Sequence, residues 1–76
     1  MKINTRFLLI KAREAYKNKA FDVAKALYTD LLECDPTVAE AWHQVGVLYA
    51  QEQQMDAAKE YIEMAVKIEA RLLQEM

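Results

Sequence analysis

The side chains that could do chemistry are few in this chain of 76 residues, which has one cysteine, one histidine and no serine. A cysteine becomes a nucleophile when a neighbouring base or cation lowers its pKa, and a third group usually orients that base. Cys34 and His43 stand on either side of Pro36, and no third group is evident. We therefore expect no catalytic activity, and we interpret Cys34 as a small apolar residue of the core.

Metal and cofactor sites find equally little support. Structural zinc sites use paired cysteines or histidines at short, regular spacings, and this chain has one of each. Acidic residues such as Glu60 and Glu63 are expected to face solvent. The sequence thus predicts neither a bound metal nor a cofactor.

Composition indicates a single helical domain over residues 1–76. Hydrophobic residues make up 54% of the chain, with one glycine and one proline, which excludes a disordered segment. The lone cysteine cannot form a disulfide within the chain, so we expect a reducing, cytoplasmic setting. The apolar run at residues 7–10 is too short for a membrane span. A pI near 5.3 without interleaved aromatic and basic residues argues against nucleic-acid binding.

Charge is distributed unevenly along the sequence. Residues 1–20 contain six basic side chains and one acidic side chain, whereas residues 21–76 contain four basic and eleven acidic ones. The net charge of −2 therefore hides a basic first quarter and an acidic remainder. Opposite charge at the two ends of the molecule could guide contact between chains.

An internal repeat organises the chain. When the sequence is shifted by 34 residues, segment 22–25 aligns with 56–59, Leu8 with Trp42, and Ala12 with Gly46. A unit of this length is one helical hairpin, which must stack on a neighbour to bury its apolar face. Function is then expected on the stacked surface and not in a pocket.

Apolar spacing predicts four helices, around residues 8–16, 24–32, 42–49 and 58–72, with polar turns at 17–19 and 51–54. Asp35 and Pro36 end the second helix, and segment 37–40 has the pattern of a capping box for the third. A glycine inside a helix costs about 1 kcal/mol relative to alanine. Gly46 therefore predicts a close helix crossing.

The second half of the chain carries a recognisable signature, formed by Trp42, Val45, Gly46, Tyr49, Ala58, Ile62 and Ala65. Their order and spacing resemble the tetratricopeptide repeat (TPR) family. The first half is a looser match. The resemblance implies an all-α fold of two antiparallel hairpins stacked as a short right-handed solenoid, with repeats at 5–38 and 39–72. Ala70 stands where a proline is common, so the last helix should continue as an extension at 73–76.

The resemblance also implies a concave groove that holds partner peptides. Carried over to this sequence, the groove positions are Arg6, Leu9, Arg13, Tyr16, Lys17, Glu40, His43, Val47, Ala50 and Gln51. The first five fall at spacings of three or four residues and so share one stripe. A known use of the family is a clamp for chaperone C-termini. This clamp is absent, because Leu9, Arg13 and Gln44 occupy its lysine and asparagine places.

Two alternatives follow for the basic stripe. Arg13 and Lys17 attract an acidic or C-terminal segment of a partner protein while Tyr16, His43 and Val47 supply apolar contacts. Alternatively, the stripe is a solvated helix face on which Arg13 pairs with a nearby carboxylate.

The final helix predicts a second surface. Its apolar stripe widens onto a flank, for which we expect self-association, formed by Tyr61, Met64, Ile68 and Leu72. Repeat arrays usually close with a polar face, so we expect this chain to be part of a longer array or to form a homo-oligomer, with exchange of helices as one route. The sequence thus predicts a non-catalytic scaffold or adaptor for a protein or peptide partner, with homotypic assembly as the alternative.

Overall fold

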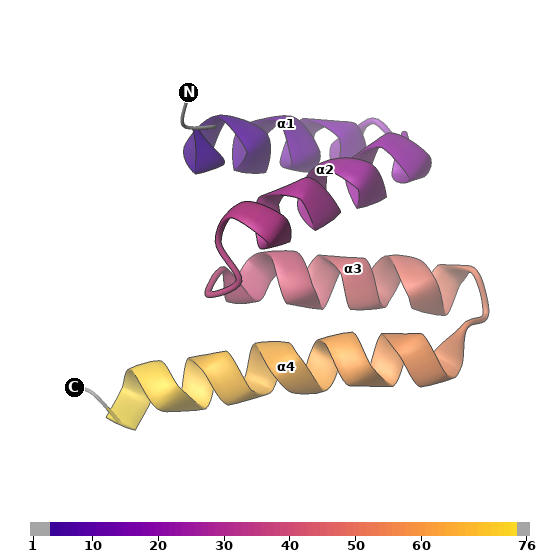
Figure 1. The fold of residues 1–76 in the computed structure, drawn as a ribbon. Coiled ribbons are helices and arrows are strands. Elements are labelled where there is room, and N and C mark those ends of the chain that lie inside the picture. Colours follow the sequence, from indigo (N-terminus) through magenta and orange to yellow (C-terminus); the bar gives the residue numbers. More distant parts are fainter. Residues whose placement is uncertain (1–3, 75–76) are drawn as a thin grey trace.

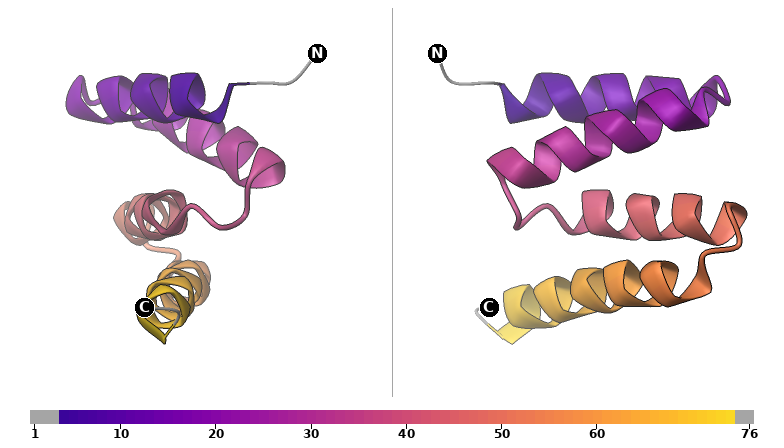
Figure 2. Two further views of the ribbon diagram at one scale, coloured as in Figure 1. Left: turned by 90° about the vertical axis from the view of Figure 1, so that its left-hand side faces the viewer. Right: turned by 45° about the vertical axis from the view of Figure 1, so that its right-hand side comes forward.

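The computed structural model describes residues 4–74, which form four helices: α1 (Thr5–Lys17), α2 (Phe21–Cys34), α3 (Ala39–Gln51) and α4 (Met55–Gln74). Helices α1 and α2 form one antiparallel hairpin and α3 and α4 form the other, stacked in chain order (Figures 1 and 2). The molecule is flat, with principal extents of 35 × 35 × 19 Å. The predicted all-α stack of two hairpins is confirmed.

The last helix is extended, as expected. It has 20 residues, against 14 in α2. Of the extension predicted at 73–76, the first two residues belong to α4, and residues 75–76 lie outside the described part of the chain.

The two hairpins use the same turn. After α1, Lys19 has a φ of 64°, and the N–H of Ala20 donates to the carbonyl of Ala15 at 2.8 Å. After α3, Gln53 has a φ of 62°, and the corresponding hydrogen bond measures 2.9 Å. Closing a helix by one residue in the left-handed region in this way satisfies carbonyls that the helix leaves without partners. The 34-residue repeat is therefore visible in backbone conformation as well as in sequence.

The predicted capping box at 37–40 is wrong. Val38 is the N-cap of α3, and its side chain makes no capping hydrogen bond. Asp35 takes both donors of Thr37, accepting the hydroxyl at 2.6 Å and the backbone N–H at 3.0 Å. These bonds close the linker as an Asx-turn, which leaves Thr37 unable to reach the first turn of the helix.

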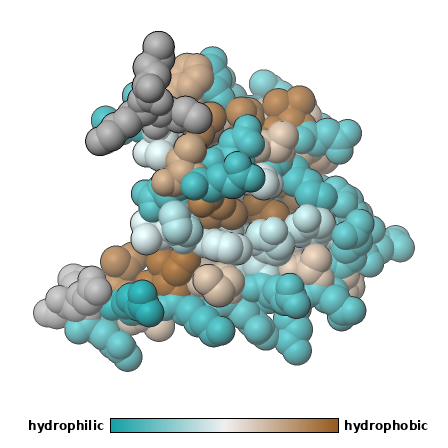
Figure 3. Space-filling view, in the orientation of Figure 1, coloured by the Kyte–Doolittle hydropathy of each residue, from teal (hydrophilic) through white to brown (hydrophobic). Residues whose placement is uncertain are grey.

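The core lies between the helices and consists mainly of small and aliphatic side chains. Its buried members are Leu8, Ala12, Ala15, Ala24, Tyr28, Leu31, Ala41, Val45 and Leu48, with Ala58 and Ala65 buried on α4. Most of the surface seen in Figure 3 is hydrophilic, and its hydrophobic areas lie chiefly between helices. The small residues at repeating places let the helices approach closely.

Cys34 is exposed, so its interpretation as a core residue is wrong. It is the last residue of α2, where the chain turns away at Asp35 and Pro36. The buried stripe of α2 ends one turn earlier at Leu31, so burial does not reach this cysteine.

Gly46 marks the close crossing of α3 and α4 that the sequence predicts. A Cβ atom at this position would lie 2.7 Å from Cγ1 of Ile62 and 3.1 Å from the carbonyl oxygen of Ala58. Real Cβ atoms essentially never make a contact under 3.0 Å. The absence of a side chain therefore sets the distance between these two helices.

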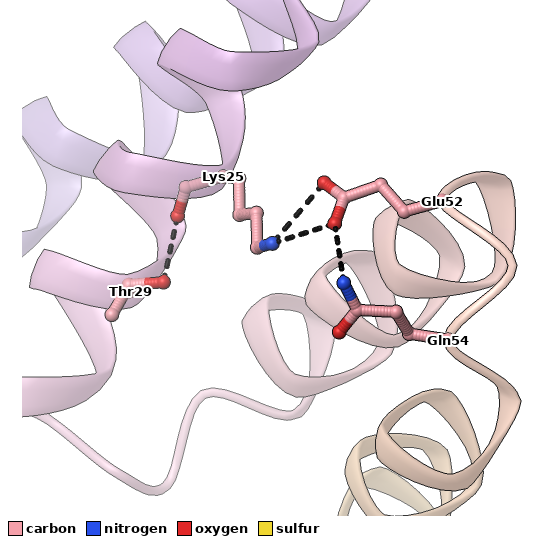
Figure 4. Close-up of polar contacts among 4 residues, drawn as sticks. All are labelled: Lys25, Thr29, Glu52 and Gln54. Atoms are coloured by element: carbon pink, nitrogen blue, oxygen red, sulfur yellow. Dashed lines mark hydrogen bonds and ion pairs between the residues drawn. The ribbon is translucent and has the colours of Figure 1, made fainter.

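Lys25 joins the two hairpins (Figure 4). Its Nζ donates to both carboxylate oxygens of Glu52, each at 3.1 Å, and lies 3.9 Å from the ring centre of Tyr49. Gln54 donates to the same carboxylate at 3.5 Å. A cation on an aromatic face with a carboxylate beside it is favourable, more so when partly desolvated.

Candidate functional site

Arg13 and Glu40 connect α1 to α3 across 27 positions of sequence. The guanidinium donates from Nε to Oε2 at 2.7 Å, and a second hydrogen bond from Nη2 to Oε1 completes a bidentate pair. Two parallel bonds of this kind fix orientation as well as distance. The pair therefore links the first helices of the two hairpins, and both of its members are predicted groove residues.

The pair changes the electrostatics of this surface. Hydrogen bonding to Arg13 lowers the pKa of the Glu40 carboxyl, and Glu40 in turn raises the pKa of Arg13. Burial raises the pKa of Tyr28, and the negative charge of Glu40 adds to that effect. The charge of Arg13 is thus compensated by a carboxylate of the other hairpin.

The five predicted groove residues of α1, which we call the α1 stripe, differ in how deeply their side chains are buried. Leu9 and Tyr16 are half-buried against the core, and the Tyr16 ring meets Phe21 edge-on at 5.5 Å between centroids. Arg6 and Lys17 are exposed, and neither forms an ion pair within residues 4–74. Uncompensated positive charge in the stripe thus lies at its two ends.

The predicted groove residues of α3, which we call the α3 stripe, include both exposed and half-buried side chains. His43 and Gln51 are exposed, whereas Val47 and Ala50 are half-buried. No hydrogen bond or ion pair in the described chain joins His43 to the α1 stripe. Among the predicted groove residues, the structure therefore brings Arg13 and Glu40 into direct contact.

Gln44 is a residue that sequence reasoning missed. Its Oε1 atom is buried and has no hydrogen-bond partner in the described chain. Gln44 stands four residues after Glu40 and three before Val47, so it lies on the same helical stripe. That spacing could have identified it, although Gln44 stands out in the sequence only as a departure from the chaperone clamp.

The predicted flank of α4 is only partly free. Tyr61 packs between two aromatic rings of α3, with centroid distances of 5.3 Å to both Trp42 and Tyr49. Burial raises its pKa. Tyr61 therefore belongs mainly to the contact between α3 and α4.

Two of the remaining flank residues, Ile68 and Leu72, line a hollow near the C-terminal end of α4. The hollow has a volume of about 520 Å³ and is lined by Thr37, Ile68, Arg71 and Leu72. Figure 3 shows a hydrophobic area between this end of α4 and the start of α3. Met64 and Ile68 are half-buried, and Leu72 is 55% exposed.

Residues 4–74 contain no group of three histidine, cysteine or acidic side chains placed to hold a metal ion. No helix in that range combines the length and the apolar character that crossing a membrane requires.

These features define an all-α protein built of two stacked helical hairpins. Residues 39–71 match the family model of the tetratricopeptide repeat, which confirms the resemblance to this family and identifies the second hairpin as one of its repeats. Such repeats generally mediate contacts between proteins. No curated protein and no solved structure matches the chain.

Proposed function

We propose that this chain is a non-catalytic adaptor that binds a segment of a partner protein along α1 and α3. The observation that carries the proposal is the bidentate pair of Arg13 and Glu40, which joins the two first helices into one surface. The repeat match supports a role in protein contacts. Surfaces of repeat proteins bind extended or helical segments through a few apolar anchors and oriented polar groups.

The chemistry of the surface indicates an acidic or C-terminal segment. Lys17 is exposed and carries positive charge beside the half-buried ring of Tyr16. Val47 and His43 offer apolar contact from α3. The unpartnered Oε1 of Gln44 would accept a backbone N–H of the bound segment, which would satisfy a buried acceptor that otherwise costs stability.

A peptide array tests the proposal. The probes are immobilised random peptides with free C-terminal carboxylates, alongside the same peptides with amidated ends. We expect the full chain to select acidic, free-ended peptides with micromolar affinity, as for a small interface. Lys17→Glu should weaken that binding about tenfold, and Lys67→Glu, an equal change of charge at an exposed site on α4, should not. Equal binding by both variants, or no selection, would contradict the proposal.

A second candidate function is assembly of identical chains through Met64, Ile68 and Leu72. The apolar hollow and the exposure of Leu72 favour it. Sedimentation equilibrium across concentrations would then show a dimer or larger species that Met64→Glu returns to monomer. A monomer at all concentrations would exclude this candidate.

We also propose a reducing cytoplasmic setting for the protein. Its single cysteine, Cys34, is exposed and has no partner cysteine in the sequence. In an oxidising compartment an exposed thiol forms disulfides between chains. Fractionation followed by thiol labelling should find the protein in the cytoplasm with Cys34 reduced.

A further inference from the structure

One stripe of α2 receives the second hairpin. Lys25 contacts Tyr49 of α3 and Glu52, the residue directly after it. Tyr28 and Leu32 follow Lys25 at spacings of three and seven residues. Residues at these spacings share one side of a helix. Tyr28 is 1% exposed and Leu32 is half-buried, so this side of α2 is covered.

The same stripe recurs on α4, where only Ile62 is partly covered, by α3 near Gly46. A shift of 34 residues takes Lys25, Tyr28 and Leu32 to Lys59, Ile62 and Val66. Met55 and Leu73 are apolar and lie on the same side of the helix. We name these five residues the α4 outer stripe: Met55, Lys59, Ile62, Val66 and Leu73. Met55 and Val66 are each 60% exposed and Leu73 is 72% exposed. Helix α4 lies at the end of the stack, with a helix on one side only (Figures 1 and 2). The outer stripe is distinct from the flank at Ile68 and Leu72.

The opposite end of the stack does not fit the α4 outer stripe. Val45 and Leu48 of α3, which are buried at the junction of the hairpins, correspond to Lys11 and Glu14 of α1. These two residues form an exposed ion pair at 3.6 Å. Docking α1 of a second copy in the register of the repeat would bury that pair, and removing two charges from water is costly.

A second copy would also fail to satisfy Lys59. In the observed junction, Lys25 is met by an aromatic ring and, three residues further along, by a carboxylate. In the first hairpin, the positions of Tyr49 and Glu52 are taken by Ala15 of α1 and by Asn18, the residue directly after α1. The occupant of the α4 outer stripe therefore differs from α1 in its last turn.

We propose that the α4 outer stripe binds an amphipathic helix of a partner protein, whose last turn carries an aromatic residue followed three positions later by an acidic one. The aromatic ring lies over the Lys59 ammonium and the carboxylate pairs with it, as happens at Lys25. Apolar residues one and two turns earlier cover Ile62 and Val66. This site is separate from the groove of α1 and α3, and a variant that loses groove binding, such as Lys17→Glu, keeps it.

The chain itself supplies the probe, a synthetic fluorescein-labelled peptide of residues 37–54. This segment contains the helix that covers the corresponding stripe of α2. Fluorescence anisotropy with the full chain should show saturable binding. Val66→Glu should weaken it at least tenfold, whereas Val23→Glu should leave it unchanged. Val23 is the matched control, because it is an exposed valine on α2 with 53% exposure, so both changes spare the core.

A charge exchange locates the contact. Lys59→Glu should weaken binding of the native peptide, and a peptide with Glu52→Lys should recover part of the loss on that variant. Binding that is insensitive to Val66→Glu would mean that the peptide replaces α3 on α2, which overturns the proposal. Absence of saturable binding also overturns it. A dimer in sedimentation that Val66→Glu abolishes would assign the stripe to a second copy and refute the partner helix.

Discussion

The Nζ atom of Lys25 lies 3.9 Å from the centre of the Tyr49 ring, and these two residues belong to different hairpins. The same ammonium donates to Glu52 at the C-terminal end of α3, where a helix carries partial negative charge. Its side chain is 25% exposed, so the contact is partly desolvated. The junction between the repeats is thus held by a polar anchor beside the apolar core.

Lys25→Ala should lower the free energy of unfolding by about 1 kcal/mol, because it removes a cation–π contact and a partly buried ion pair together. Urea unfolding followed by circular dichroism measures the change. Lys59→Ala is the matched control at the equivalent place of the second repeat, where no helix covers the side chain, and should change stability by less than about 0.5 kcal/mol. Equal losses for the two variants would show that Lys25 does not hold the junction.

Gly46→Ala should lower stability by about 1 kcal/mol, although alanine favours the helix. The new methyl group meets Ile62 at 2.7 Å and the carbonyl of Ala58 at 3.1 Å, and overpacking of this kind costs about 1–3 kcal/mol. The helix preference of alanine returns about 1 kcal/mol. Thermal and urea unfolding of the purified variant measure the balance.

Two comparisons separate this packing effect from helix propensity. The loss caused by Gly46→Ala should be smaller when Ile62 is replaced by alanine, since the nearest contact is then gone. In the first repeat, Ala12 occupies the place of Gly46 and is fully buried. There Ala12→Gly should also destabilise by about 1 kcal/mol. A gain in stability from Gly46→Ala would show that the crossing has room for a methyl group.

Stability should depend on pH through Glu40. Its pKa is lowered in the folded chain by Arg13, so the carboxylate stabilises the fold above its ordinary pKa and loses this effect as pH falls through the lowered value. Glu40→Gln should cost about 0.5–1 kcal/mol at neutral pH, as for a half-exposed pair. Urea unfolding should show the difference from the native chain shrinking as the pH falls below the ordinary pKa of a glutamate, about 4.3.

A matched substitution checks the assignment to this pair. Glu63→Gln changes the same group on an exposed face of α4, where the described chain shows no ion pair, and should alter stability little at any pH. If Glu40→Gln and Glu63→Gln had equal effects, the contact of Glu40 with Arg13 would contribute nothing measurable.

The fold could be predicted from the sequence because its signals are local and occur twice. Spacing of apolar residues, polar turns and the glycine at the crossing all recur or correspond after 34 residues, and stacking follows from the need to bury one face. The error at Cys34 has a local cause as well. Periodicity assigns a residue to one face of its helix. It does not show whether a neighbouring helix still covers that face at the helix end.

The candidate site was less accessible to sequence reasoning. Whether Arg13 is free or paired depends on where Glu40 lies after two helices and a linker, and small changes in hairpin angle would separate them. The flank of α4 illustrates the same point, since Tyr61 is enclosed by Trp42 and Tyr49 only through the actual spacing of α3 and α4. Positions on a stripe were predictable, and contacts between stripes required the structure.

Glycine in place of Lys19 or Gln53, the residues with positive φ in the two turns, should stabilise the protein. Lys19 and Gln53 hold φ values of 64° and 62°, a region that costs most residues about 1–2 kcal/mol and glycine almost nothing. Part of that gain is lost to the greater freedom of glycine in the unfolded chain, so Lys19→Gly and Gln53→Gly should each raise stability by about 0.5–1 kcal/mol. Urea unfolding of the single and double variants measures the effect, and the two gains should add, because the turns share no partner.

Asn18→Gly is the control, since Asn18 has a φ of −85°. There glycine brings no relief and only adds freedom to the unfolded chain, so stability should fall. A loss at Lys19 and Gln53 equal to that at Asn18 would mean that the side chains, and not the backbone, decide these turns.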